Sequence, residues 1–143
     1  MASNISETVR IICMSDTHSR YQFPMPAGDI LVHTGDFSMT GEQIEVESYI
    51  NCLKSLTHYR LKVIFAGNHD LTLEPAFYEK NWERWHRGRK QNYEQIGRLV
   101  RDPSLATQYG IIYLEDQAFV DNVTGLKIYG RYKVYFTCFH LTE

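Results

Sequence analysis

Three short apolar runs recur along the first half of the chain, at residues 9–14, 29–33 and 62–66. Each run ends abruptly at polar residues, and none alternates between apolar and polar positions. Short β-branched runs without alternation are typical of parallel strands that are buried on both faces. Between the second and third runs, apolar residues across 41–56 fall near helical spacing, and glutamates crowd the first turns. Residues 29–66 are therefore predicted to form a β-α-β unit with a right-handed crossover.

The pattern changes further along the chain. Two more segments have helical spacing. Residues 72–85 carry Pro75 in the first turn, and residues 93–100 are followed by Asp102-Pro103, which closes the helix. Three apolar segments are then predicted as strands, at residues 110–114, 118–123 and 126–129. Turn-forming residues between the last two predict that they form a hairpin. The expected fold is α/β, with a mostly parallel sheet, flanking helices and then a β-hairpin.

Length and charge narrow the classes of protein. The chain has 143 residues, enough for one domain with a core. Its net charge of -2 gives no electrostatic case for binding a nucleic-acid polymer or a membrane surface. No apolar run is long enough to span a bilayer. Three cysteines without C-x-x-C spacing fit a reducing compartment, so a cytoplasmic location is the expectation.

Polar clusters follow each of the three apolar runs. Asp16 and His18 come after the first, Asp36 after the second, and Asn68 and His69 after the third. Ligands bind at the carboxyl ends of parallel strands, so these side chains are expected to meet. Each aspartate alone is an ordinary turn residue, but a chance match at all the positions in order is improbable. Carboxylate, imidazole and carbonyl oxygen suit Mn, Fe or Zn. Two divalent ions about 3.5–4 Å apart would activate a water and stabilise displacement at phosphorus.

The same clusters carry a family resemblance. Asp16-x-His18, Gly35-Asp36 and Gly67-Asn68-His69-Asp70 resemble, in order and spacing, the D-x-H, G-D and G-N-H-[DE] blocks of the calcineurin-like metallophosphoesterases. The wording is similar to the subgroup named for its metallophosphoesterase domain. The resemblance implies that residues 9–130 form the first half of an α/β sandwich domain, followed by a divergent tail at 131–143.

The resemblance also implies a role for each residue. Asp16 and His18 would bind the first metal ion, Asp36 would bridge two ions, and Asn68 would bind the second. His69 would stay off the metals and act on the substrate as the catalytic residue. The implied activity is hydrolysis of a small phosphate ester by a metal-bound hydroxide. A phosphodiesterase is expected, with a nucleotide as one candidate substrate.

Two departures from the family pattern qualify this expectation. Many members carry a second acid three residues after the bridging aspartate, and Met39 stands at that position here. The later G-H and G-H-x-H blocks do not follow Gly130. Activity of this chain is therefore expected to be impaired. A non-catalytic remnant or partner-binding fragment stays open as the alternative, and a structural single-metal protein as a weaker one.

Four side chains outside the blocks also carry predictions. His33, inside the second predicted strand, is expected to pack in the core or to support the ligands from behind. His58 and His86 are expected on the surface. Cys13 is expected to be a small buried apolar residue.

Overall fold

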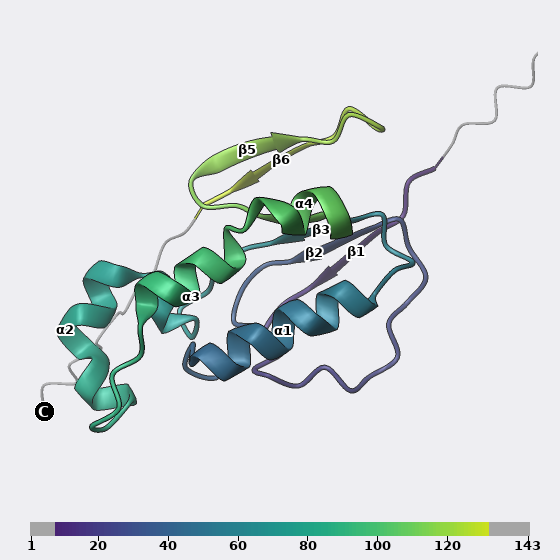
Figure 1. Cartoon of the computed structure of the whole chain (residues 1–143). Helices are drawn as coiled ribbons and strands as arrows, with labels where there is room; N and C mark the ends of the chain where they lie inside the picture. Colours follow the sequence, from purple (N-terminus) through teal and green to yellow (C-terminus); the bar gives the residue numbers. More distant parts are fainter. Residues whose placement is uncertain (1–7, 132–143) are drawn as a thin grey trace, which may run out of the picture.

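A four-stranded parallel sheet forms the centre of the computed structural model, which describes residues 8–131. Its strands follow one another in space in the same order as in the sequence (Figure 1): β1 (Ile11–Met14), β2 (Ile30–His33), β3 (Leu61–Ile64) and β4 (Ile111–Tyr113). β2, α1 (Gln43–Ser55) and β3 form the predicted β-α-β unit, with Ile30 opposite Leu61. The predicted α/β class is thus confirmed.

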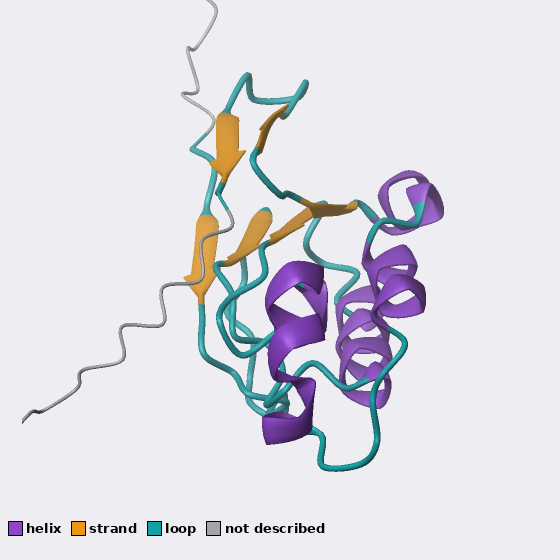
Figure 2. Cartoon of the chain, turned by 90° about the vertical axis from the view of Figure 1, so that its left-hand side faces the viewer, coloured by secondary structure: helices purple, strands orange, loops and turns teal. Residues whose placement is uncertain are grey.

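The two faces of the sheet carry different layers. Alternate strand residues such as Leu31 and Ile64 face the helices, where they pack with α1, α3 (Tyr93–Val100) and α4 (Pro103–Tyr109). Figure 2 shows these helices gathered on one side of the strands. The intervening residues pack against the hairpin of β5 (Gln117–Val120) and β6 (Lys127–Gly130), through Phe119, Leu126 and Ile128. The predicted hairpin is therefore confirmed, and it begins the second layer of the molecule.

An ion pair fixes the hairpin to the main sheet. Asp121, which follows β5, accepts two hydrogen bonds of 2.8 Å from the guanidinium group of Arg60, just before β3. The same carboxylate accepts the hydroxyl of Thr124 at 2.5 Å. The paired guanidinium holds the pKa of Asp121 well below its usual range. Asp121 is buried, while the side chain of Arg60 is 36% exposed, so the pair is shielded from solvent on the carboxylate side only.

Two helical segments differ from the prediction. The predicted helix at 72–85 is divided into a 3₁₀ turn, η1 (Leu71–Leu73), and α2 (Pro75–Trp85), because proline favours the first position of a helix. α4 was not predicted. Asp102 caps it by accepting the Ser104 N–H at 2.9 Å, and Gly110 ends it with φ 63°. Asp102-Pro103 is thus the start of a helix as well as the end of the previous one.

Burial confirms two of the four side-chain predictions. His33 is fully buried and His58 is exposed, as expected. The prediction for Cys13 is wrong, because β1 is an edge strand and Cys13 is exposed on it. The prediction for His86 is also wrong. Its ring is buried at the end of α2, where its Nδ1 lies 2.6 Å from the hydroxyl of the equally buried Tyr78.

None of the helices in the described part of the chain is long and apolar enough to cross a membrane. The divergent tail predicted at 131–143 lies outside the described residues, apart from Arg131.

Candidate metal centre

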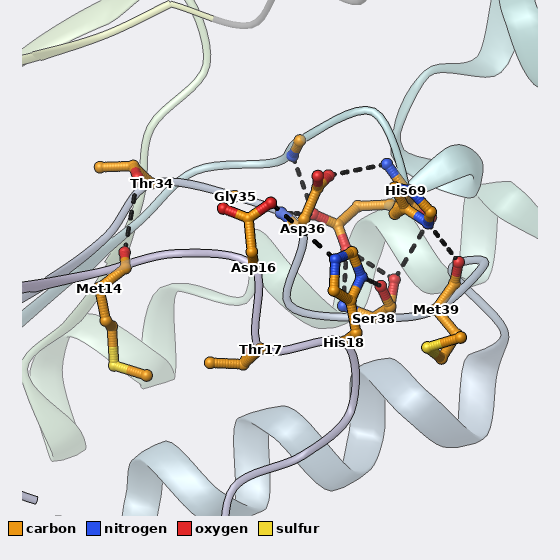
Figure 3. Close-up of polar contacts among 12 residues, drawn as sticks. Met14, Asp16, Thr17, His18, Thr34, Gly35, Asp36, Ser38, Met39 and His69 are labelled. Carbon is orange, nitrogen blue, oxygen red and sulfur yellow. Dashed lines mark hydrogen bonds and ion pairs between the residues drawn. The ribbon is translucent and has the colours of Figure 1, made fainter.

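The loops after β1 and β2 run side by side beyond the ends of their strands. The N–H of Asp16 donates to the carbonyl of Gly35 at 3.0 Å, and the N–H of His18 donates to the carbonyl of Asp36 at 3.0 Å. The third loop joins them, because the His69 N–H donates to Oδ1 of Asp36 at 2.8 Å. The three polar clusters of the sequence therefore meet at one edge of the sheet, as Figure 3 shows.

Three side chains at this edge could share a metal ion. One donor atom from each of His18, Asp36 and His69 lies within 4.8 Å of the other two. The rings of His18 and His69 meet edge to face, with centroids 4.6 Å apart. Asp16 lies beside them, with Oδ1 at 3.9 Å from Nε2 of His18 (Figure 3). Nitrogen and carboxylate oxygen donors at this spacing are a ligand set suited to Mn, Fe or Zn.

Hydrogen bonds determine which nitrogen of each imidazole is free. Nδ1 of His18 lies 3.3 Å from the carbonyl of Ser38, and Nδ1 of His69 lies 2.9 Å from the carbonyl of Met39. A carbonyl oxygen only accepts, so Nδ1 must carry the proton in both rings. Nε2 is left with its lone pair, and metal-binding histidines commonly show this arrangement. The residues present therefore fit a metal centre.

The backbone at this edge adopts an uncommon conformation. Among the described residues, five non-glycine residues have positive φ, and four of these lie in the first two loops: Asp16 at 56°, His18 at 43°, Ser19 at 62° and Asp36 at 55°. Each left-handed residue costs free energy, and such strain persists only where the surroundings impose it. The strain is thus concentrated where the candidate ligands lie.

Two glycines let the second and third loops approach each other. A Cβ on Gly67 would overlap the carboxylate and the backbone nitrogen of Asp36. Gly35 has φ 115°, and a Cβ there would lie 2.8 Å from Cα of Gly67. Both positions therefore require glycine for this close approach of the two backbones.

Asp70 holds these two loops together, a role that the sequence reasoning missed. Its fully buried carboxylate accepts the N–H groups of Asp36 at 2.9 Å, Ser38 at 2.9 Å and Gly67 at 2.8 Å. Burial raises its pKa to about 6, against the lowering effect of these hydrogen bonds. Its place as the last residue of the third block was the available signal.

His33 supports the first two loops from the core. Its Nδ1 accepts the Gly35 N–H at 3.3 Å, so its Nε2 carries the proton and donates to Oγ1 of Thr17 at 2.9 Å. Burial lowers its pKa to about 4, which keeps the ring neutral. His33 thus links the turn before Asp36 to the residue between Asp16 and His18.

The structure brings most of the predicted site residues together. His18, Asp36 and His69 form the cluster, and Asp16 borders it. Asn68 lies exposed in the turn between Gly67 and His69. His69 is as close to the other donors as a ligand would be, although the resemblance implied a place off the metals. The ligand assignments to Asp16, His18, Asp36 and Asn68, and the catalytic role of His69, stay predictions.

Comparisons with known proteins agree with this geometry. A sequence model of the calcineurin-like phosphoesterase family matches residues 9–136. Metallophosphoesterase domain-containing protein 1 of Homo sapiens is 35% identical over 129 residues, covering 85% of this chain and 36% of that protein. The Mus musculus protein of the same name matches equally well. A Caenorhabditis elegans protein is 34% identical over 125 residues, covering 85% of this chain and 40% of its own length.

The chain spans well under half the length of these relatives. The family model nevertheless covers most of the chain, including all three polar blocks. The family name denotes metal-dependent hydrolysis of phosphoric esters, which the grouped His and Asp donors suit. The chain therefore belongs to the calcineurin-like phosphoesterase family.

Proposed function

We propose that this chain supplies metal ligands and a catalytic histidine to a phosphodiesterase that acts on small phosphodiesters, with nucleotides among the candidate substrates. The observation that carries the proposal is the cluster of His18, Asp36 and His69, in which both imidazoles have Nδ1 facing a carbonyl and Nε2 free. Two divalent ions bound at this edge would supply Lewis acidity and an activated water.

The chain's own residues have separable tasks in this proposal. Asp16 and His18 supply metal-binding atoms from the first loop. Asp36 places its carboxylate between the first and third loops, where its Oδ1 accepts the His69 N–H. His69 is a member of the cluster, with its Nδ1–H held by the Met39 carbonyl. In the proposal a second proton on Nε2 makes the ring a donor that stabilises charge on the phosphate or protonates the leaving oxygen. Asn68, in the exposed turn, is the proposed additional ligand.

A second candidate is metal binding without hydrolysis. In the part of the chain that the structure describes, the cluster of His, Cys, Asp or Glu donors numbers three residues. Two ions that each need several ligands would share few protein donors. A partner-binding fragment with weak metal affinity therefore remains the alternative function.

The experiment compares two aspartates in the same backbone conformation. Asp36 has φ 55° and the exposed Asp116 has φ 49°, and asparagine tolerates this left-handed region. Asp36→Asn should remove most of the bound Mn²⁺ after dialysis, measured by elemental analysis, and most of the hydrolysis of bis-nitrophenyl phosphate. Asp116→Asn should change neither. Equal metal content in the parent and Asp36→Asn would refute the metal centre. Metal bound without Asp36-dependent hydrolysis would favour the second candidate.

A further inference from the structure

Glu45, in the first turn of α1, makes more hydrogen bonds than a helix cap requires. It reaches back to the N–H of Glu42, the residue before the helix, at 3.0 Å, which is one half of a capping box. The same carboxylate also accepts the N–H groups of Met39 at 2.8 Å and Thr40 at 3.1 Å. It accepts the hydroxyl of Ser19 at 2.7 Å as well. Capping explains the first of these bonds and leaves the other three unexplained.

The extra bonds lead to His69 through a single peptide group. The carbonyl of Met39 and the N–H of Thr40 belong to the same peptide. Oε2 of Glu45 accepts from the N–H side at 3.1 Å, and Nδ1 of His69 donates to the carbonyl side at 2.9 Å. Hydrogen bonds in such a chain polarise one another, so a carboxylate on the N–H strengthens the carbonyl as an acceptor. The charge of Glu45 is therefore felt at the His69 ring without direct contact.

This chain has no acid at the position where many family members carry one. Met39 occupies it, and the residue is 48% exposed while its backbone makes both contacts. Burial works to raise the pKa of Glu45, but the hydrogen bonds that it accepts outweigh burial and lower the pKa below its usual value. Glu45 is thus a charged carboxylate at neutral pH, held against the peptide that partners His69.

We propose that Glu45 is a positioning residue for His69, acting through the peptide group between Met39 and Thr40. It fixes the direction of the Met39 carbonyl, and so fixes the ring orientation and the proton position of His69. Through Ser19 it also fixes the loop that carries His18. The proposal rests on the proposed function for its catalytic consequence, but its structural content can be measured without any activity.

The first measurement uses the unsubstituted 143-residue chain without added metal. Long-range ¹H–¹⁵N spectra at alkaline pH, where histidines are neutral, report which nitrogen of each ring carries the proton. Free neutral histidine favours the Nε2–H form. His69, assigned by loss of its signals in His69→Gln, should instead show the Nδ1–H form. A His69 ring in the Nε2–H form would overturn the proposal, whatever any variant does.

The second measurement compares Glu45→Gln with Glu47→Gln. Glu47 lies on the same helix. Among the described residues, its side chain accepts one hydrogen bond, from the side-chain amide of Gln43 at 2.7 Å. Glu45→Gln should shift His69 toward the Nε2–H form and move the Thr40 amide resonance, and Glu47→Gln should do neither. Met39→Ala should leave both signals in place, because only the Met39 backbone is used. Unchanged His69 signals in a folded Glu45→Gln chain would overturn the proposal.

The third measurement tests the catalytic consequence with bis-nitrophenyl phosphate and Mn²⁺. Loss of an outer hydrogen-bond partner commonly costs about 10- to 100-fold. Glu45→Gln should lower kcat by about that factor with bound metal unchanged, and should add little to His69→Ala. If Glu45→Gln lowered kcat by the same factor in the His69→Ala chain as in the parent, Glu45 would have a general structural role, and the proposal would be overturned. An unsubstituted chain without metal-dependent hydrolysis would refute the proposed function instead, and the ring spectra would still decide for or against Glu45.

Discussion

Protonation of His33 should destabilise the fold by an amount that follows from its surroundings. The ring is fully buried and both nitrogens are satisfied only in the neutral form, by the Gly35 N–H and the Thr17 hydroxyl. A proton on Nδ1 would face the Gly35 N–H donor. Burial lowers the pKa of His33 to about 4, and a nearby Asp16 only partly opposes this effect. In the unfolded chain the pKa of a histidine is about 6.5.

The change in the free energy of unfolding with pH follows from the difference in proton binding by His33 between the folded and unfolded chains. Between pH 6.5 and 4 the unfolded chain binds a proton at His33 that the folded chain does not. The contribution of neutral His33 to stability is therefore complete above about pH 6.5 and is lost as the pH falls toward 4. A difference of about 2.5 pKa units, at about 1.36 kcal/mol each, gives a loss of about 3 kcal/mol.

The assay is urea unfolding of the parent and His33→Gln, in EDTA, from about pH 7 to about pH 4. The comparison is needed because Asp70 acts in the opposite sense: burial raises its pKa to about 6, so its protonation adds stability over the same range. Asp70 is present in both chains and cancels in the difference. The stability of the parent relative to His33→Gln should fall by about 3 kcal/mol across this range. A difference that stays constant with pH would refute the reasoning.

Two further predictions concern other parts of the molecule. Asp121→Asn should lower the free energy of unfolding by about 1–3 kcal/mol at neutral pH, since it weakens the paired Arg60 contact of a buried side chain. Because the pKa of Asp121 is held low, the difference in urea midpoint between the parent and Asp121→Asn should shrink under acid conditions. Asp116→Asn is the control. A difference between the parent and Asp121→Asn that does not depend on pH would contradict the ion pair. Tyr49→Phe should raise the melting temperature, because the buried hydroxyl has no hydrogen-bond partner among the described residues and the ring stack on Phe37, with centroids 4.3 Å apart, is kept. A lower melting temperature would show that this hydroxyl is bonded.

The sequence alone was sufficient for the order of the elements and for the place of the site. β2, α1 and β3 follow from apolar runs and helical spacing, which reflect contacts between near neighbours in the chain. The positions of Asp16, Asp36 and His69 at the ends of strands follow from the same pattern. Parallel strands then bring those ends to one edge, so their approach was predictable.

Burial was less predictable, because it depends on which element covers which surface. The apolar run at 9–14 resembles the runs of β2 and β3, yet β1 is an edge strand and exposes Ile11 and Cys13. His86 follows a helix and precedes a basic run, which predicted an exposed residue. Its ring is nevertheless buried, and its Nδ1 lies within hydrogen-bond distance of the buried Tyr78 hydroxyl. In both cases the packing of distant segments decided the outcome.

The hydrogen bonds that orient the candidate centre were decided by the tertiary structure. Asp70 accepts the Asp36 N–H across 34 residues of sequence, and Glu45 accepts the Ser19 hydroxyl across 26. The partner of His69 is a backbone carbonyl, which every residue possesses and no sequence pattern distinguishes. Side-chain types and spacing determined which chemical groups reach this edge of the sheet. The directions of individual peptide groups, set only when the three loops pack together, determined which nitrogen, oxygen and proton face one another there.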